Sequence, residues 1–270
     1  MAEIQFPEFS ALTENDWQYF LSFGAPQNYL SKVANELQYE NRFFTDFRFQ
    51  RLLYWYAMRP ENPKVPKCTL NAGTILFRAR IYDAKNDAEE KTPEFQGYGQ
   101  QGSFVPLDND IVPEGRINPA RIRYLYTAHS VMTAVAEVNP RIKEKVSVAE
   151  IKTLKALEIL SFCPWWTSTP LVNGKTNPLY EWQDSLRLAF TRVFNRNYQN
   201  AGDYLLCQYV SEFIKNLGYD GIAFRSSRVK MDPENDRQDI NYTIFNYEKC
   251  RAISSRLFSV KNLTYMLKNE

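Results

Sequence analysis

Hydrophobic positions recur at helical spacing through the first sixty residues of the chain. Thr13 precedes a short acidic segment, which predicts the start of a helix. Two amphipathic stretches follow, near 27–39 and 43–58. In the second stretch, large apolar side chains fall on one face: Phe43, Phe44, Phe47, Leu52 and Trp55. This spacing predicts a small helical N-terminal region with an aromatic face packed into a core.

The pattern then changes from helical to extended. Three prolines within 59–68 predict an extended linker. Residues 74–82 alternate, with Phe77, Ala79 and Ile81 on one face and Leu76, Arg78 and Arg80 on the other, which predicts a strand with two unlike faces. Similar short runs predict strands over 122–127, 145–151, 157–162, 219–227 and 241–247, with one or two more in the last twenty residues.

Helices and loops separate these strands. We expect a short helix over 130–138 and longer ones over 181–196 and 202–217, the last ended by Gly218. The glycine-rich stretch 95–106 has no clear period and predicts a mobile loop. Further irregular segments are a loop at 163–180 and a charged insert at 228–240.

The order of these elements predicts the fold class. The βα alternation is too irregular for a doubly wound sheet, and there is no internal repeat. We therefore expect an α+β protein, with a helical region over 1–70 and a mixed β domain over 71–270.

Composition narrows the class of protein. With 270 residues, 44% hydrophobic and 24% charged, the chain is typical of a soluble globular protein. Its net charge of +2 and the sparse arginines 116, 121 and 123 do not favour nucleic acid. No signal peptide or bilayer-length apolar run is present, so no membrane association is expected. Four scattered cysteines and one histidine, His129, argue against a metal site or disulfide framework, and we expect free thiols in a reducing cytoplasm.

Polar residues in apolar surroundings are the candidates for chemistry. They include Arg78 in a strand, Arg116 in a Gly-Arg turn and Glu137 in a short apolar helix. Glu137 lies off the apolar face of that helix, beside small residues that leave room for a ligand. From periodicity alone, a solvated glutamate on the outer face is the better interpretation. A Ser-His-Asp site is not indicated, because no GxSxG motif is present. Spacing alone thus yields an α+β protein with a candidate anion site.

Four motifs in order resemble the RES domain family. They are FRAR (77–80), GRINPARIRYLYTAHSVMTAVAEVNP (115–140), VSVAEI (146–151) and GYDGIAFRSS…NYTIF (218–245). The family is named for an Arg, a Glu and a Ser, which match Arg78, Glu137 and Ser226 here. The resemblance implies a fold similar to ADP-ribosyltransferases of the diphtheria-toxin type. It also implies a bacterial, cytoplasmic toxin of a toxin–antitoxin pair that consumes NAD⁺ at its nicotinamide–ribose bond.

The resemblance assigns roles to single residues. Glu137 is expected to stabilise positive charge on the ribose, with Arg78 and Ser226 as the other catalytic residues. Arginines suit the pyrophosphate, and a tyrosine ring suits the flat nicotinamide. The expected NAD⁺-binding residues are Arg116, Tyr126, Tyr124, Arg80 and Asn241.

The same resemblance leaves the acceptor and the partners open. NAD⁺ is the substrate, inorganic phosphate is one co-substrate, and no metal is expected. Water as acceptor gives an NAD⁺ glycohydrolase, phosphate a phosphorylase, and a protein side chain an ADP-ribosyltransferase. A catalytically dead binding module is disfavoured because all three signature residues are present. A helix-turn-helix antitoxin is the expected partner. Two parts of the chain are additions to the compact family domain, namely the N-terminal region and the 163–200 segment. Three roles are open for them: to replace a separate antitoxin, to form a homo-oligomer, or to bind a protein acceptor.

Overall fold

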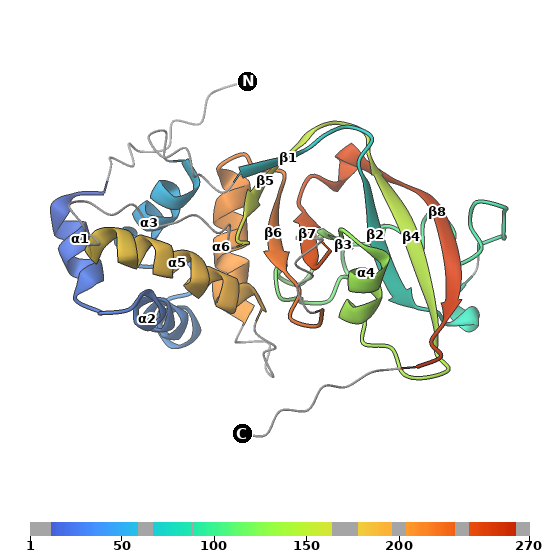
Figure 1. The fold of residues 1–270 in the computed structure, drawn as a ribbon, viewed down its shortest axis with the longest axis horizontal. Helices are drawn as coiled ribbons and strands as arrows, with labels where there is room; N and C mark the ends of the chain where they lie inside the picture. The colour runs from blue at the N-terminus through green and yellow to red at the C-terminus, as the bar shows by residue number, and fades with distance from the viewer. Residues whose placement is uncertain are drawn as a thin grey trace. The chain divides into compact units, whose positions relative to one another are not determined.

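The computed structural model of the chain describes residues 12–58, 67–87, 89–163, 178–195, 204–229 and 238–262. Six α-helices and eight β-strands lie within these residues (Figure 1), and the strands pair both parallel and antiparallel. The α+β fold class is therefore confirmed. Most of the predicted linker at 59–68, loop at 163–180 and insert at 228–240 lies outside the described residues.

The chain forms two compact units that interleave along the sequence. The first contains residues 1–68, 113–120 and 159–224, and the second contains 69–112, 121–158 and 225–270. This grouping differs from the predicted division into 1–70 and 71–270. The reason is that two later helices pack with the N-terminal helices and complete their core.

The first unit is mainly helical. Its helices are α1 (Glu14–Leu21), α2 (Pro26–Tyr39), α3 (Phe47–Met58), α5 (Pro178–Asn195) and α6 (Leu205–Asn216). Two of its strands, β5 (Leu157–Ser161) and β6 (Gly221–Arg225), pair in parallel. The strand β1 (Lys67–Leu70) follows α3 in the chain, where an extended linker was expected to end. No helix among the described residues is long and apolar enough to cross a membrane.

Local sequence explains how these helices begin and end. The Thr13 side chain accepts the Asp16 backbone N–H, and the Asp16 carboxylate accepts the Thr13 N–H, which confirms the predicted cap of α1. Gly218 follows α6 with a φ of 91°, as expected for a glycine that ends a helix. The predicted helix over 43–58 starts only at Phe47, so Phe43 and Phe44 lie outside it and are each 79% exposed.

Aromatic rings fill the core of the first unit. Phe20 stacks on Trp182 with ring centroids 5.5 Å apart, and Tyr56 stacks on Phe162 at 5.6 Å. Such pairs add roughly 0.5–1.5 kcal/mol each beyond the apolar area that they bury. An aromatic core is thus present, but Phe43, Phe44 and Phe47 of the predicted face are exposed and do not belong to it.

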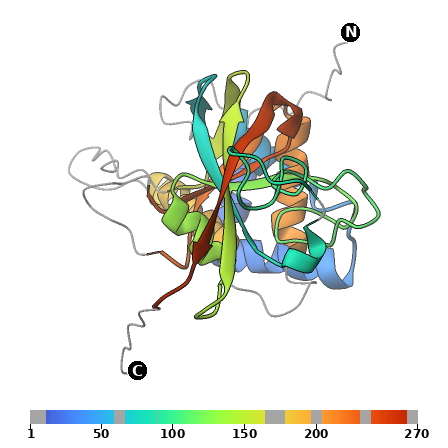
Figure 2. The same ribbon diagram turned by 90° about the vertical axis from the view of Figure 1, so that its right-hand side faces the viewer.

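The second unit is built on an antiparallel sheet in the order β7-β3-β2-β4-β8. The strands are β2 (Ile75–Ile81), β3 (Leu125–Ala128), β4 (Lys145–Thr153), β7 (Ile240–Ile244) and β8 (Cys250–Ser259). The helix α4 (Val131–Glu137) packs one face of this sheet, against Ala79, Val146 and Val148. Figure 2 shows α4 on one side of the sheet and the long 82–123 connection on the other.

Alternation along β2 gives the sheet two different faces, as predicted. Phe77 and Ala79 belong to the core under α4, so Arg78 and Arg80 belong to the opposite face. Other strands differ at their ends from the prediction: β3 starts at Leu125, and the last twenty residues contribute to one long strand, β8, that begins at Cys250.

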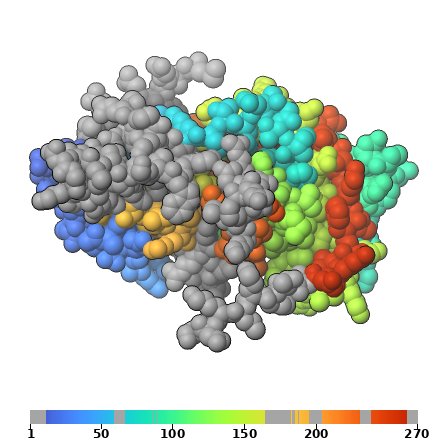
Figure 3. All heavy atoms as spheres, viewed as in Figure 1, coloured from blue at the N-terminus to red at the C-terminus, as the bar shows by residue number. Residues whose placement is uncertain are grey.

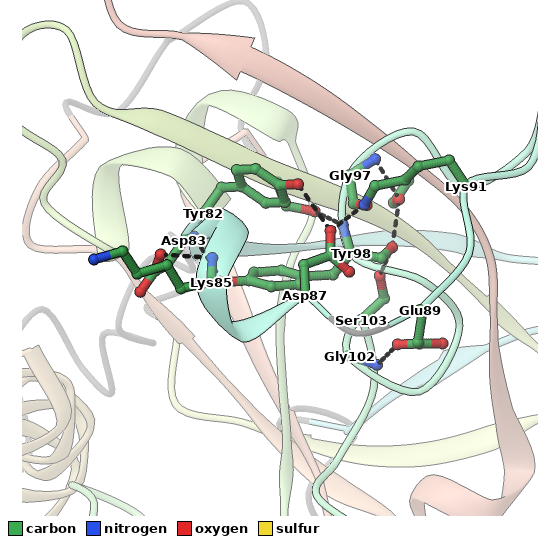
Figure 4. Close-up of polar contacts among 12 residues, drawn as sticks. Tyr82, Asp83, Lys85, Asp87, Glu89, Lys91, Gly97, Tyr98, Gly102 and Ser103 are labelled. Carbon is green, nitrogen blue, oxygen red and sulfur yellow. Dashed lines mark hydrogen bonds and ion pairs between the residues drawn. The ribbon is translucent and has the colours of Figure 1, made fainter.

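The 95–103 loop is held against the sheet, so the prediction of a mobile loop is wrong. The Gly97 N–H donates to Ser255 Oγ at 3.0 Å, and the Tyr98 N–H donates to Ser147 Oγ at 2.9 Å. The Ser255 hydroxyl donates in turn to the Tyr98 carbonyl at 2.6 Å. A Cβ on Gly97 would lie 2.2 Å from Ser147 Oγ, so glycine permits this close approach. Figure 4 shows the loop and the polar contacts that fix it.

Candidate functional site

Glu137 is the last residue of α4. The helix begins at Ser130, whose hydroxyl accepts the Thr133 backbone N–H. It ends after seven residues, before Asn139 with a φ of 48°. The Glu137 side chain is half-buried at this end. Figure 3 shows that α4 (light green) and the end of β8 (red) reach the surface on the same face of the molecule.

The Glu137 carboxylate is held through one of its two oxygens. The Ser226 hydroxyl donates to Oε1 at 2.6 Å, and the Asn241 side-chain amide donates to the same oxygen at 2.7 Å. Among the described residues, none donates a hydrogen bond to Oε2. The structure therefore contradicts the interpretation of Glu137 as a solvated residue on an outer face. It is a fixed carboxylate with one oxygen left for another partner.

Buried contacts fix the positions of Ser226 and Asn241, the two residues that donate hydrogen bonds to Glu137. Ser226 directly follows β6, and its backbone N–H donates to the Asp239 carbonyl at 2.6 Å. The Asp239 carboxylate pairs with Arg225 at 2.6 Å, with side chains only 3% and 13% exposed. This ion pair joins the end of β6 to the start of β7, and so it places Ser226 and Asn241 on the same side of Glu137.

The other end of α4 is tied to the same segment. The hydroxyls of Ser130 and Thr133 donate to the Gln238 carbonyl at 3.0 and 2.6 Å. Both ends of α4 are therefore fixed to residues beside β7. Sequence analysis missed these supporting residues, although the cap pattern at Ser130 is visible in the sequence.

Arg78 lies where β2 and β3 part. The two strands share one register pair, Phe77 with Ala128, and beyond it the Arg78 guanidinium donates to the Tyr126 carbonyl at 3.3 Å. Its buried Nε has no partner among the described residues. Burial, and to a smaller extent the nearby charge of Arg80, lowers the pKa of Arg78 to about 10. A buried guanidinium with so few partners is suited to an anion.

Glu137 and Ser226, two of the three signature residues, are joined by a hydrogen bond. Glu137, Ser226 and Asn241 form one cluster, and Tyr126 shares the α4 face of the sheet because it alternates with Ala128. Arg78 belongs to the opposite face of β2, and no hydrogen bond or ion pair joins it to Glu137 in the described part of the chain.

Two predicted NAD⁺-binding residues of the second unit, Arg80 and Tyr124, have structural contacts of their own. Arg80 donates to the Gly102 carbonyl and lies over the Tyr98 ring, 4.8 Å from its centroid, so it secures the 95–103 loop. Tyr124 is buried against Phe245, with ring centroids 4.7 Å apart. Tyr126 is half-buried.

Arg116 belongs to the first unit, whereas Glu137 belongs to the second. Its guanidinium donates to the Phe194 carbonyl at 2.7 Å, in the last turn of α5. A cation at this end satisfies a carbonyl that the helix leaves open. Burial raises the pKa of the neighbouring Cys207 to about 12, and the charge of Arg116 opposes this shift.

The described residues contain no group of His, Cys, Asp or Glu side chains that could hold a metal ion. The four cysteines are free thiols, as the sequence predicts, and three of them are buried.

Comparison with known proteins now identifies the family. The model of the RES domain matches residues 79–265. The chain belongs to the RES domain family. The match includes all three members of the Glu137 cluster and begins one residue after Arg78. No curated protein matches this RES domain protein.

A solved structure is also similar. It is the crystal structure of the M. tuberculosis MbcT–MbcA toxin–antitoxin complex, with 13% sequence identity and a TM-score of 0.39. The similarity covers 71% of this RES domain protein and 87% of the other chain.

Proposed function

We propose that this RES domain protein cleaves NAD⁺ at the bond between nicotinamide and ribose. The observation that carries the proposal is the Glu137 carboxylate, which two donors hold through Oε1 while Oε2 accepts none among the described residues. Membership of the RES family supports the choice of NAD⁺ as substrate.

A carboxylate of this kind suits the charge that develops in the reaction. When the bond to nicotinamide breaks, nicotinamide leaves as a neutral molecule with the bonding electrons, and positive charge builds on the ribose. Glu137 attracts that charge more strongly as it grows, so the contact favours the transition state over the bound substrate. An acceptor then bonds to the ribose carbon and gives up a proton.

The neighbours of Glu137 keep the carboxylate in place during this change. Ser226 and Asn241 donate to Oε1 from two different segments, so the carboxylate cannot turn without losing both hydrogen bonds. In this proposal Arg78 meets the pyrophosphate, and Tyr126 offers its ring to nicotinamide. Arg116, Arg80 and Tyr124 are less suited to this task, because each already has a contact that supports the fold.

The proposal extends to the acceptor and the partner. Water or inorganic phosphate accepts the ADP-ribose group, and depletion of NAD⁺ makes the protein toxin-like. An antitoxin of the helix-turn-helix type is the partner that the family implies. Transfer to a protein side chain is the alternative, which the product analysis below distinguishes.

The test is NAD⁺ turnover by the purified protein with and without phosphate, with products separated by chromatography. Glu137→Gln keeps an oxygen that can accept from Ser226 and Asn241 but removes the charge. We expect it to lower kcat by roughly a hundredfold or more, on the scale of one lost transition-state contact. Glu144→Gln is the matched control, because the Glu144 side chain accepts only the Arg141 backbone N–H among the described residues.

Each product has a clear meaning. Free ADP-ribose indicates water as acceptor, and ADP-ribose 1″-phosphate formed only with phosphate indicates phosphorolysis. ADP-ribose bound to protein indicates the transferase. Normal turnover by a folded Glu137→Gln protein would contradict the proposal in all three forms.

A further inference from the structure

A cavity of about 790 Å³ opens along one face of α6 in the first unit. Pockets that bind small molecules typically measure roughly 300–1,000 Å³, so this cavity has the right size. Its walls come from the end of α2, residues 42–50, residues 114–120 and α6, all within the first unit. None of its residues belongs to the Glu137 cluster.

Apolar side chains form much of the wall. They include Leu37, Phe43, Leu205, Phe213 and Leu217. Phe43 is 79% exposed, so an apolar molecule in the cavity would shield it from water. The wall is therefore suited to a molecule with an apolar body.

One buried polar side chain in the wall has an unused acceptor. Gln208 is only 4% exposed, and its amide nitrogen donates to Glu114 Oε1 at 3.0 Å and to the Gly115 carbonyl at 2.9 Å. A third acceptor, the Asn118 carbonyl, lies at 3.3 Å from the same nitrogen. These three oxygens fix which end of the amide is the nitrogen. The carbonyl Oε1 accepts no hydrogen bond from any described residue, and Gln208 lines the cavity.

A carboxylate lies one helical turn further along the same wall. Glu212 is four residues after Gln208 on α6, so the two side chains are neighbours on one face. It is half-buried and has no hydrogen bond or ion pair among the described residues. Burial raises the pKa of Glu212, and Lys215 opposes the shift. Burial thus removes water from this carboxylate, and Lys215 acts on it only as a nearby charge, with no ion pair between the two among the described residues.

No cationic side chain in the cavity wall pairs with Glu212 among the described residues. Arg42 also lines the cavity, but it is exposed and forms no ion pair with Glu212 among the described residues. Glu114 adds a second carboxylate to the lining. The polar part of the wall beside α6 therefore offers acceptors, and it calls for donors with positive charge.

We propose that this cavity binds a small organic cation, with an ammonium or guanidinium group on an apolar body. The charged group donates to Gln208 Oε1 and to the Glu212 carboxylate, and the body lies against Phe213 and Leu217. The site is separate from the proposed NAD⁺ site and does not depend on that proposal.

Calorimetric titration with phenethylamine, which is protonated at pH 7, tests the site. The uncharged 2-phenylethanol and the anionic 3-phenylpropionate are matched in shape. We expect phenethylamine to bind at least about tenfold more tightly than the alcohol, because hydrogen bonds to charged groups are the stronger ones. The acid should not bind. Glu212→Gln should weaken phenethylamine by about tenfold or more, whereas Glu248→Gln, an exposed carboxylate in the second unit, should leave it unchanged.

The proposal is overturned if phenethylamine shows no binding at concentrations up to about 10 mM, because a dissociation constant above that value is too weak for a specific site. It is also overturned if the alcohol binds as tightly as the amine, or if a folded Glu212→Gln protein binds the amine unchanged. Circular dichroism of both variants establishes that they are folded. NAD⁺ turnover is measured on the same samples, so a failure of one proposal is not mistaken for a failure of the other.

Discussion

The two sides of the sheet in the second unit use their polar groups in opposite ways. On the loop side, Ser255 Oγ both accepts from Gly97 and donates to Tyr98, and Ser147 Oγ accepts from Tyr98. On the α4 side, Glu137 receives two donors on one oxygen and none from the described residues on the other.

The charged groups on the loop side likewise bond to other parts of the protein. On the loop side, Asp87 accepts from Tyr82 at 2.8 Å and pairs with Lys91, which also donates to the Gly97 carbonyl (Figure 4). These charges serve to fasten the connection between strands. A polar group whose bonds are all internal holds a chain in place, whereas a fixed group with one open position can act on a ligand. This difference, more than burial or residue type, separates the candidate site from the fastening of the loop.

The substitution with the largest expected effect on the difference between the two sides of the sheet is Asn241→Asp. It replaces a donor 2.7 Å from Glu137 Oε1 with a second carboxylate. Two carboxylates so close favour one shared proton, so a single negative charge is divided between them, and Glu137 also loses the amide donor that holds Oε1. We expect NAD⁺ turnover to fall by about a hundredfold or more. Asn241→Ala should lose less, and turnover equal to wild type in the Asp variant would show that the charge of Glu137 is not required.

A second change addresses the loop side. Gly97→Ala places a methyl group against Ser147 Oγ and should displace the loop. Overpacking of this kind costs about 1–3 kcal/mol, so we expect a clearly lower Tm. Gln101→Ala, in an exposed part of the same loop, should leave the Tm unchanged. An unchanged Tm for Gly97→Ala would mean that the loop contacts contribute little to stability.

The smallest expected effect concerns Arg78. It has one internal hydrogen bond, unlike the fully bonded groups that fasten the loop, and its Nε has no partner among the described residues. Arg78→Met removes a buried cation that has only one hydrogen bond among those described, at 3.3 Å. Buried charges of this kind contribute little to folding, so the Tm should stay the same or rise. The KM for NAD⁺ should increase by about tenfold, because a charge-assisted contact to pyrophosphate is lost.

The pH dependence of Arg78 sharpens that test. Its lowered pKa, about 10, still leaves the side chain protonated at pH 7–8. Contact with an anion should therefore be constant over that range and weaken only as the pH rises toward 10. A KM that is unaffected by Arg78→Met would exclude this residue from substrate binding.

Much of the fold follows from local sequence. The capping box at Thr13, the alternation of β2 and the glycine after α6 are short-range signals, and each predicted the element that the structure contains. The start of α3 was predicted too early, because aromatic spacing before Phe47 imitates a helix face. The 95–103 loop was misjudged because its fixing partners, Ser147 and Ser255, lie far away in the sequence.

The candidate site was harder to predict from short-range sequence signals than the fold. Apolar surroundings made Glu137 a candidate, but periodicity favoured a solvated residue, and only the family resemblance assigned roles to Glu137 and Ser226. The reason is physical: the contacts that define Glu137 join residues 89 and 104 positions apart, and no local pattern encodes them. The resemblance in turn did not indicate that Arg78 lies on the other face of β2 from the core under α4.

The two-ended attachment of α4 has a consequence for folding. A seven-residue helix is far below the roughly 12–15 residues at which helices become even marginally stable alone. The helix therefore persists only after distant parts of the chain have met, and closing such long loops is an entropically costly step. A partly folded chain consequently has no ordered carboxylate at this position. For the reaction proposed above, the Glu137 carboxylate is therefore in place only once the native topology has formed.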